Sequence, residues 1–275
     1  MKVREKIHDF FSAMAPIFTY YIVSITGALF CTIFIFINGM RSNITLISSS
    51  TIPAKEIYIS RIIITLFCFI AVIIEIKTNK LKFSDISPVK QNIKVYFAVI
   101  ILAVGTFFTA KFINSLFIHI AGISTSESAS DESEYKLVLM FINSLILPIT
   151  EELVFRGLTV KKFENKFPAL FTAAVTTIFF AAIRLSMNIM CYAVLLSVML
   201  IFIRYKFGDL KLCILTHIIV SILFLFSNYI FAAYYDSVKN IGGVIGIAAT
   251  AAALFCMIKF ASKPEGANSP SIETD

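Results

Sequence analysis

Long apolar stretches alternate with short polar breaks along most of the 275 residues of the chain. A membrane-spanning helix needs about 20 mainly apolar residues. Candidate spans of this kind lie at about 14–38, 57–76, 93–120, 137–160, 168–185, 187–203, 212–234 and 241–260. The break between the fifth and sixth is very short, so either could be a partial span. The pattern therefore predicts an all-α fold, a polytopic transmembrane helix bundle of seven or eight spans.

The composition is typical of a membrane protein. Hydrophobic residues make up 58% of the chain and charged residues 15%, whereas a soluble domain has about 45–50% and 25%. The first apolar run is about 25 residues long and lacks a small-residue cleavage site, so we expect it to remain as a span. The five cysteines lie inside apolar runs without paired spacing, which argues against disulfides and thiolate metal sites.

The basic residues orient the predicted spans. If the N-terminus is cytoplasmic, 16 of the 24 Lys and Arg residues fall in cytoplasmic segments and six on the opposite side. This bias follows the positive-inside rule, so we expect an integral protein of the cell membrane with both termini in the cytoplasm. The net charge of +7 is spread over several connections and forms no single patch, which makes nucleic acid an improbable partner.

Three charged residues interrupt the fourth apolar run. They are Glu151, Glu152 and Arg156. A charge at the centre of a membrane helix costs about 2.5–3.5 kcal/mol on insertion scales, and such residues are generally functional. The alternative, that the two glutamates merely lie at the membrane surface, is less favoured.

Helical spacing separates the roles of the two glutamates. Glu152 and Arg156 are four residues apart on one face, so we expect a buried structural ion pair. Glu151 is rotated by about 100° from Glu152, which leaves it free to point into a different cavity as an unpaired carboxylate. Pro148 removes a backbone donor and can kink the helix, which would admit water beside Glu151.

Two later runs supply possible partners. His217 and Ser221 share one helix face, although a lone histidine in an apolar run can also be a satisfied core residue. At 1.5 Å per residue from the basic helix ends, Glu151 and His217 lie roughly 15 Å and 9 Å from the cytoplasmic face. The same count places Arg184 deeper, nearer the other side. We expect the first motif and His217 to converge on one interior cavity that opens toward the cytoplasmic half of the bilayer.

These residues resemble the motifs of a known family. Glu-Glu-x-x-x-Arg, Phe-x-x-x-His and His-x-x-x-Asn on neighbouring membrane helices are typical of the CAAX-protease and bacteriocin-processing family of intramembrane endopeptidases, also called the CPBP or Abi family. Residues 151–157 match the first motif fully, including its Phe-Arg-Gly ending. The run from Tyr205 to His217 resembles the approach to the third motif. The similarity covers about residues 137–234.

Two positions depart from the family pattern. The second motif ends in Arg184 where the family has histidine, and the third ends in Ser221 where it has asparagine. The resemblance implies that Glu151 is the general base and His217 an oxyanion donor. Arginine cannot accept a proton at working pH, but it could hold Glu151 ionised and weaken it as a base. Such losses cost about 10²–10⁴-fold for a general base and about 10²–10³-fold for an oxyanion donor.

The resemblance and the composition together divide the chain. We expect N-terminal membrane helices and an acidic extracytoplasmic loop at 1–135, a CPBP-like core at 136–234, a last membrane helix at 235–262 and a disordered tail at 263–275. The acidic loop contains Glu127, Asp131, Glu132 and Glu134.

Three functions remain open from the sequence. The first is an intramembrane glutamic endopeptidase that cleaves peptide or lipidated substrates of the CAAX or bacteriocin type. The second is a catalytically impaired relative that serves as a bacteriocin-immunity or regulatory binding protein. The third, less favoured, is a transporter that uses Glu151, Arg156 and Arg184 as contacts. All three place the chain in membrane lipid. No cofactor is expected, and a metal site looks poor because only His217 and carboxylates remain as ligands.

Overall fold

The structure is a computed structural model that describes most of the chain. The described residues are 3–41, 54–81, 91–121, 134–164, 166–184, 187–227 and 235–260. Most of the acidic loop and the whole of the predicted tail, 263–275, lie outside them.

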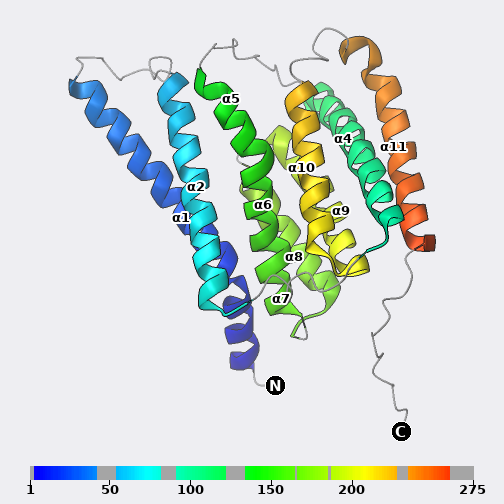
Figure 1. Cartoon of the computed structure of the whole chain (residues 1–275), viewed down its shortest axis with the longest axis horizontal. Helices are drawn as coiled ribbons and strands as arrows, with labels where there is room; N and C mark the ends of the chain where they lie inside the picture. The colour runs from blue at the N-terminus through cyan, green and yellow to red at the C-terminus, as the bar shows by residue number, and fades with distance from the viewer. Residues whose placement is uncertain are drawn as a thin grey trace.

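Helices account for nearly all of the described residues, and no strand occurs among them. The elements are α1 (Val3–Arg41), α2 (Ala54–Thr78), α4 (Ile93–Ala121), α5 (Glu134–Phe141), η2 (Ile142–Ile146), α6 (Leu147–Glu152), η3 (Leu153–Thr159), α7 (Val160–Phe163), α8 (Ala169–Ala182), α9 (Met187–Phe207), α10 (Leu210–Ser227) and α11 (Tyr235–Phe260). The elements from α5 to α7 follow one another without a break and form one continuous helical segment (Figure 1). The all-α prediction is confirmed.

Five of these helical segments are long and apolar enough to cross a membrane, judged on the described residues by length and composition. They are Val3–Asn38, Lys55–Thr78, Ile93–Leu116, Val138–Phe163 and Leu210–Ser227. Two shorter apolar helices, Ala169–Ala182 and Gly242–Ile258, accompany them. These helices form a polytopic bundle, which confirms the predicted fold class for an integral membrane protein.

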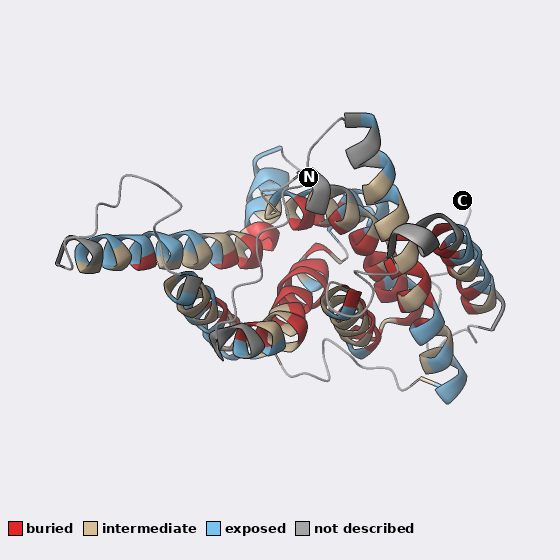
Figure 2. Cartoon of the chain, turned by 90° about the horizontal axis from the view of Figure 1, so that it is seen from above, coloured by how far each residue is buried: buried red, intermediate tan, exposed pale blue. Residues whose placement is uncertain are grey.

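The continuous segment α5–α7 lies at the centre of the bundle. All ten residues from Glu151 to Val160 are buried, and α1, α8, α9 and α10 pack around this stretch. Viewed from above, buried residues gather in these central helices, whereas the outer length of α1 extends away from them with mostly exposed residues (Figure 2). The exposed residues of α1 are apolar, among them Ile25, Phe30 and Ile33, as expected for a face in contact with lipid.

Two π-helical segments, η2 and η3, flank the paired glutamates. A π-helix shifts the backbone hydrogen bond from i→i+4 to i→i+5, and such segments are frequent at functional sites. Pro148, which has no N–H, is the second residue of α6 and lies in its first turn. The loosening that Pro148 predicts therefore takes the form of a π-helical segment within a continuous helix.

Close backbone packing joins α4 to α11. A Cβ on Gly105 would lie 2.7 Å from the backbone nitrogen of Thr250, and one on Gly246 would lie 2.9 Å from that of Thr109. The hydroxyl groups of Thr109 and Thr250 are 3.4 Å apart at the same contact. The small residues of α11 thus serve close helix packing within the chain.

Candidate active site

The first motif places three charged side chains in the fully buried part of the central segment. Glu151 and Glu152 close α6, and Arg156 lies in η3. Their exposed fractions are 1%, 0% and 0%. Burial of unpaired charges is costly, so each of these groups requires a partner of opposite charge or hydrogen bonds.

The predicted pair between Glu152 and Arg156 is present. Nη1 of Arg156 lies 3.2 Å from Oε1 of Glu152. Nη2 of Arg156 donates to Oγ of Ser197 at 2.6 Å and to the Ser197 carbonyl at 3.2 Å. Arg204 in turn donates from Nε to the Arg156 carbonyl at 3.0 Å. The guanidinium of Arg156 therefore ties the central segment to α9.

The expectation that Glu151 is unpaired is wrong. Nη2 of Arg184 lies 2.8 Å from Oε1 and 2.6 Å from Oε2 of Glu151, so both carboxylate oxygens accept from it. The expected depth of Arg184 is also wrong. Helix α8 has only 14 residues and ends at the level of Glu151, so Arg184, two residues beyond its end, reaches the carboxylate.

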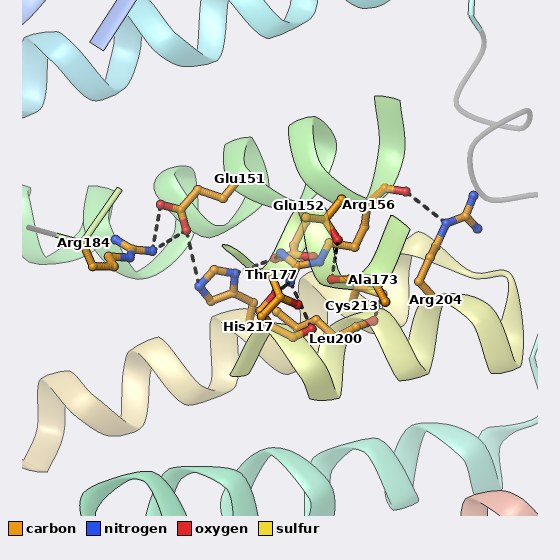
Figure 3. A network of polar contacts seen from close by, with 12 residues as sticks. Glu151, Glu152, Arg156, Ala173, Thr177, Arg184, Leu200, Arg204, Cys213 and His217 are labelled. Atoms are coloured by element: carbon orange, nitrogen blue, oxygen red, sulfur yellow. Dashed lines mark hydrogen bonds and ion pairs between the residues drawn. The ribbon is translucent and has the colours of Figure 1, made fainter. Parts of the chain in front are cut away.

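His217 bridges the two glutamates (Figure 3). Its Nδ1 lies 2.8 Å from Oε1 of Glu152, and its Nε2 lies 3.7 Å from Oε2 of Glu151. Oε1 of Glu152 also accepts a hydrogen bond from Arg156. An ionised carboxylate only accepts hydrogen bonds, so opposite an ionised Glu152 the ring of His217 carries its proton on Nδ1. In the neutral ring Nε2 is then the acceptor, and it faces Glu151.

The charges of this cluster balance. Two carboxylates and two guanidinium groups cancel, so a neutral His217 leaves the buried site without net charge. The ring of Phe180 packs among them, 4.5 Å from Cζ of Arg156 and 5.4 Å from Cζ of Arg184. Cations over an aromatic face are stabilised by the ring quadrupole. Phe180 therefore supports both arginines and separates the two ion pairs.

The cluster forms one end of a cavity of about 680 Å³. Glu151, Arg184, His217 and Ser221 all line it, so the residues of the three motifs share one space. The cavity continues past residues of α1, α2, α5, η2 and α9. Tyr20 of α1 and Tyr192 of α9 add hydroxyl groups to its wall.

The lining residues show at which end of the bundle the cavity extends to the helix ends. The lining reaches Tyr58, near the start of α2, Leu139, near the start of α5, and Leu225, near the end of α10. These ends lie opposite the basic ends of the same helices at Lys77, Lys161 and Lys211. On the basic side the central segment is packed on all faces, which closes the cavity there. With a cytoplasmic N-terminus, the cavity would open toward the extracytoplasmic half.

Some contributors to the site were not predicted from the sequence. Ser197 resembles any other serine in an apolar helix, and no spacing rule connects it to Arg156. Arg204 lies in the short connection between the predicted spans 187–203 and 212–234, but it is 5% exposed and binds the Arg156 and Gly208 carbonyls. The only sequence signal for these contacts is weak: Arg204 is a basic residue one turn before Gly208, where the helix ends.

Comparison with known proteins finds a family match in the central region. Residues 133–223 match the family described as type II CAAX prenyl endopeptidase Rce1-like. No curated protein and no solved structure matches the chain. The matched region contains α5 to α9 and most of α10, and with them every charged residue of the buried cluster. The central region is therefore similar to a family of proteases, which is consistent with the resemblance of its motifs to the CPBP family.

Proposed function

We propose that the protein is an intramembrane endopeptidase that cleaves a peptide or lipidated substrate within the cavity. The match of the central region to a protease family supports the reaction class. The observation that carries the proposal is the 3.7 Å gap between Nε2 of His217 and Oε2 of Glu151. A water molecule placed about 2.8 Å from each atom would fit this gap and donate one hydrogen bond to each.

This water is the proposed nucleophile. Its oxygen attacks the carbonyl carbon of the scissile peptide bond, and Nε2 of His217 takes its proton. The imidazolium that forms lies between two carboxylates, which stabilise the positive charge. It then returns the proton to the leaving nitrogen as the carbon–nitrogen bond breaks. The products are a carboxylic acid and an amine, so the hydrolysis consumes one water.

The surrounding residues divide the remaining work in this proposal. Glu152 orients the imidazole and fixes its tautomer, because it accepts from Nδ1. Glu151, held by Arg184, orients the water. Arg184 is also a candidate for stabilising the oxyanion, since its Nε has no hydrogen-bond partner among the described residues. These assignments differ from those that the family resemblance implies, because the base is His217 instead of Glu151 and the oxyanion contact is Arg184 instead of His217.

A second candidate function is supported by one contact. A carboxylate that accepts two hydrogen bonds from a guanidinium group has less capacity to take a proton. If Glu151 must act as the base, the contact with Arg184 favours an impaired relative that binds a peptide, as in bacteriocin immunity or regulation. The structure offers the transporter alternative no comparable support.

A cleavage assay separates the two candidates. Purified protein in lipid nanodiscs would be given a mixture of transmembrane and lipidated peptides, and products would be read by mass spectrometry. We expect cleavage by the parent that Glu151→Gln and His217→Ala abolish, while Glu164→Gln, outside the cluster, retains it. The double change Arg184→His with Ser221→Asn should not raise the rate. An inactive parent that becomes active with this double change would support the binding protein instead.

A further inference from the structure

The wall that α2 contributes to the cavity carries a basic residue with no carboxylate to pair with. Tyr58, Arg61, Thr65 and Cys68 all line the cavity. Their spacing of three or four residues places them on one face of the helix. The guanidinium group of Arg61 forms no ion pair with any residue that the structure describes, and the Arg61 carbonyl oxygen accepts from the Thr65 hydroxyl.

The other described arginines around the site differ from Arg61. Arg156 is paired with Glu152, Arg184 with Glu151, and Arg204 approaches Glu164 at 3.5 Å. Glu151 is the one carboxylate in the described lining, and Arg184 already occupies both of its oxygens. The cavity therefore has an excess positive charge at Arg61.

Neutral hydrogen-bonding groups accompany Arg61. Tyr58 lies one turn before it on α2, and Asn143 of η2 lies on the facing segment. Helices α2 and α5 start at the same end of the bundle (Figure 1), with Arg61 seven residues into α2 and Asn143 nine residues beyond the start of α5. The two residues thus lie at a similar depth. A guanidinium group with a phenol and an amide provides donors suited to a carboxylate.

We propose that Arg61 is a specificity-determining residue that binds a carboxylate of the peptide substrate. The inference depends on the proposed endopeptidase function, because it assigns a substrate class to the same cavity. Glu151 lies ten residues farther along its segment than Arg61 lies along α2, or roughly 15 Å at 1.5 Å per residue. An extended peptide covers this length in about four or five residues at roughly 3.3 Å each. The preferred substrate carries a carboxylate at that spacing from the scissile bond, on an acidic side chain or at the C-terminus.

Peptide binding tests this independently of cleavage. The chain contains no tryptophan, so the fluorescence of a peptide with one tryptophan reports binding without background. The inactive form His217→Ala is used for the assay because it leaves the Glu151–Arg184 pair in place. Three acetylated apolar octapeptides are compared: one with a free C-terminal carboxylate, one with an amide, and one with an amide and a single internal glutamate.

The expected result is an acid preference that depends on Arg61. At least one acidic peptide should bind about tenfold more tightly than the neutral amide, and Arg61→Gln should remove this difference. Arg61→Lys should retain part of the preference for the acidic peptide. Lys77→Gln, at the far end of the same helix, should retain the full preference. The responding peptide shows whether a terminal or a side-chain carboxylate is bound. Thermal unfolding of each variant verifies that it is folded.

Three results would overturn the proposal. The first is equal binding of acidic and neutral peptides, or no binding of either. The second is an acid preference that survives Arg61→Gln. The third is a change confined to vesicles, in which Arg61→Gln weakens retention on phosphatidylglycerol but leaves the peptide preference intact, because Arg61 would then bind a lipid phosphate. Acid-selective binding without turnover would instead contradict the endopeptidase function and leave the role of Arg61 in place.

Discussion

At the scale of single residues, one carboxylate oxygen organises the buried site. Oε1 of Glu152 accepts from both Arg156 and His217, so the residue expected to have only a structural role also orients the imidazole. Oε2 of Glu152 has no partner among the described residues. Loss of the Glu152 carboxylate would therefore change both the charge balance of the site and the orientation of the imidazole.

The first prediction concerns the stability of the Glu152–Arg156 pair. Arg156→Ala should destabilise the protein by about 3–5 kcal/mol, because it leaves a buried carboxylate without its guanidinium partner. Glu151→Gln should have a smaller effect, since the Arg184 side chain it leaves unpaired is 22% exposed to the cavity. Thermal unfolding in detergent provides the comparison. Equal unfolding temperatures for Arg156→Ala and the parent would argue against the pair as a stabilising element.

The second prediction concerns the orientation of His217. Glu152→Gln keeps the side-chain volume but removes the carboxylate that fixes the proton on Nδ1. We expect kcat to fall by about 10⁴-fold, as when a carboxylate that orients a catalytic imidazole is replaced by its amide, with little change in KM. Measurement of kcat and KM on folded protein checks this. If the loss of activity is explained entirely by a smaller fraction of folded protein, Glu152 has no orienting role.

The limits of sequence interpretation are visible at these residues. The pair Glu152–Arg156 is predictable because both residues lie on one helix at a fixed spacing. The contact between Arg184 and Glu151 joins segments 33 positions apart and depends on where α8 ends. Residue spacing along one helix does not predict the distance between side chains on two different segments. Ser197 and Arg61 are missed for the same reason, since their roles arise only from neighbouring helices.

At the scale of elements, irregularities of the helices position the site. The short α8 brings Arg184 to Glu151, and η2 and η3 reorient the residues around the two glutamates. Apolar periodicity predicts where the helices lie, but it does not distinguish π from α hydrogen bonding, because both leave apolar residues inside. Glycines also matter at this scale, because Gly105 of α4 and Gly246 of α11 allow the backbones of these two helices to approach closely.

The third prediction addresses this contact. Gly105→Ala and Gly246→Ala should each destabilise the protein by about 1–3 kcal/mol, because the added methyl group meets backbone atoms that cannot yield. Gly27→Ala is the matched control, since its Cβ would meet the flexible side chain of Ile64 at 3.3 Å and alanine is the better helix former. Unfolding temperatures in detergent measure the difference. An effect of Gly27→Ala as large as the other two would remove the special role of the α4–α11 contact.

At the scale of the whole molecule, the bundle has two unlike ends. Lys162 pairs with Glu75 and Lys166 with Asp9 at one end, whereas the cavity extends toward the other. The sequence predicted the helices and the basic bias, but not the direction of the cavity. That direction depends on which side of the central segment is closed by packing, and no linear pattern encodes this.

The fourth prediction concerns orientation in the cell membrane. Lys55 and Lys77 lie 22 residues apart at the two ends of α2, or about 33 Å along the helix, close to the thickness of the bilayer core. In intact cells an impermeant maleimide should label Lys55→Cys but not Lys77→Cys, and permeabilisation should expose the second site. The parent, whose described cysteines lie within the helices, reports background. The reverse pattern would place the N-terminus outside and the cavity opening in the cytoplasm.

The pairing of Glu151 with Arg184 also has a consequence for biosynthesis. Glu152 and Arg156 lie on the same segment and can neutralise each other as soon as it leaves the ribosome. Glu151 can form its ion pair only after Arg184, 33 residues later, has been synthesised. Synthesis of these residues takes about 2–7 s at typical translation rates of roughly 5–20 residues per second. During this interval the central segment carries an uncompensated carboxylate. Its stable integration is therefore expected to occur together with α8, and the insertion machinery would have to hold the two segments until the ion pair forms.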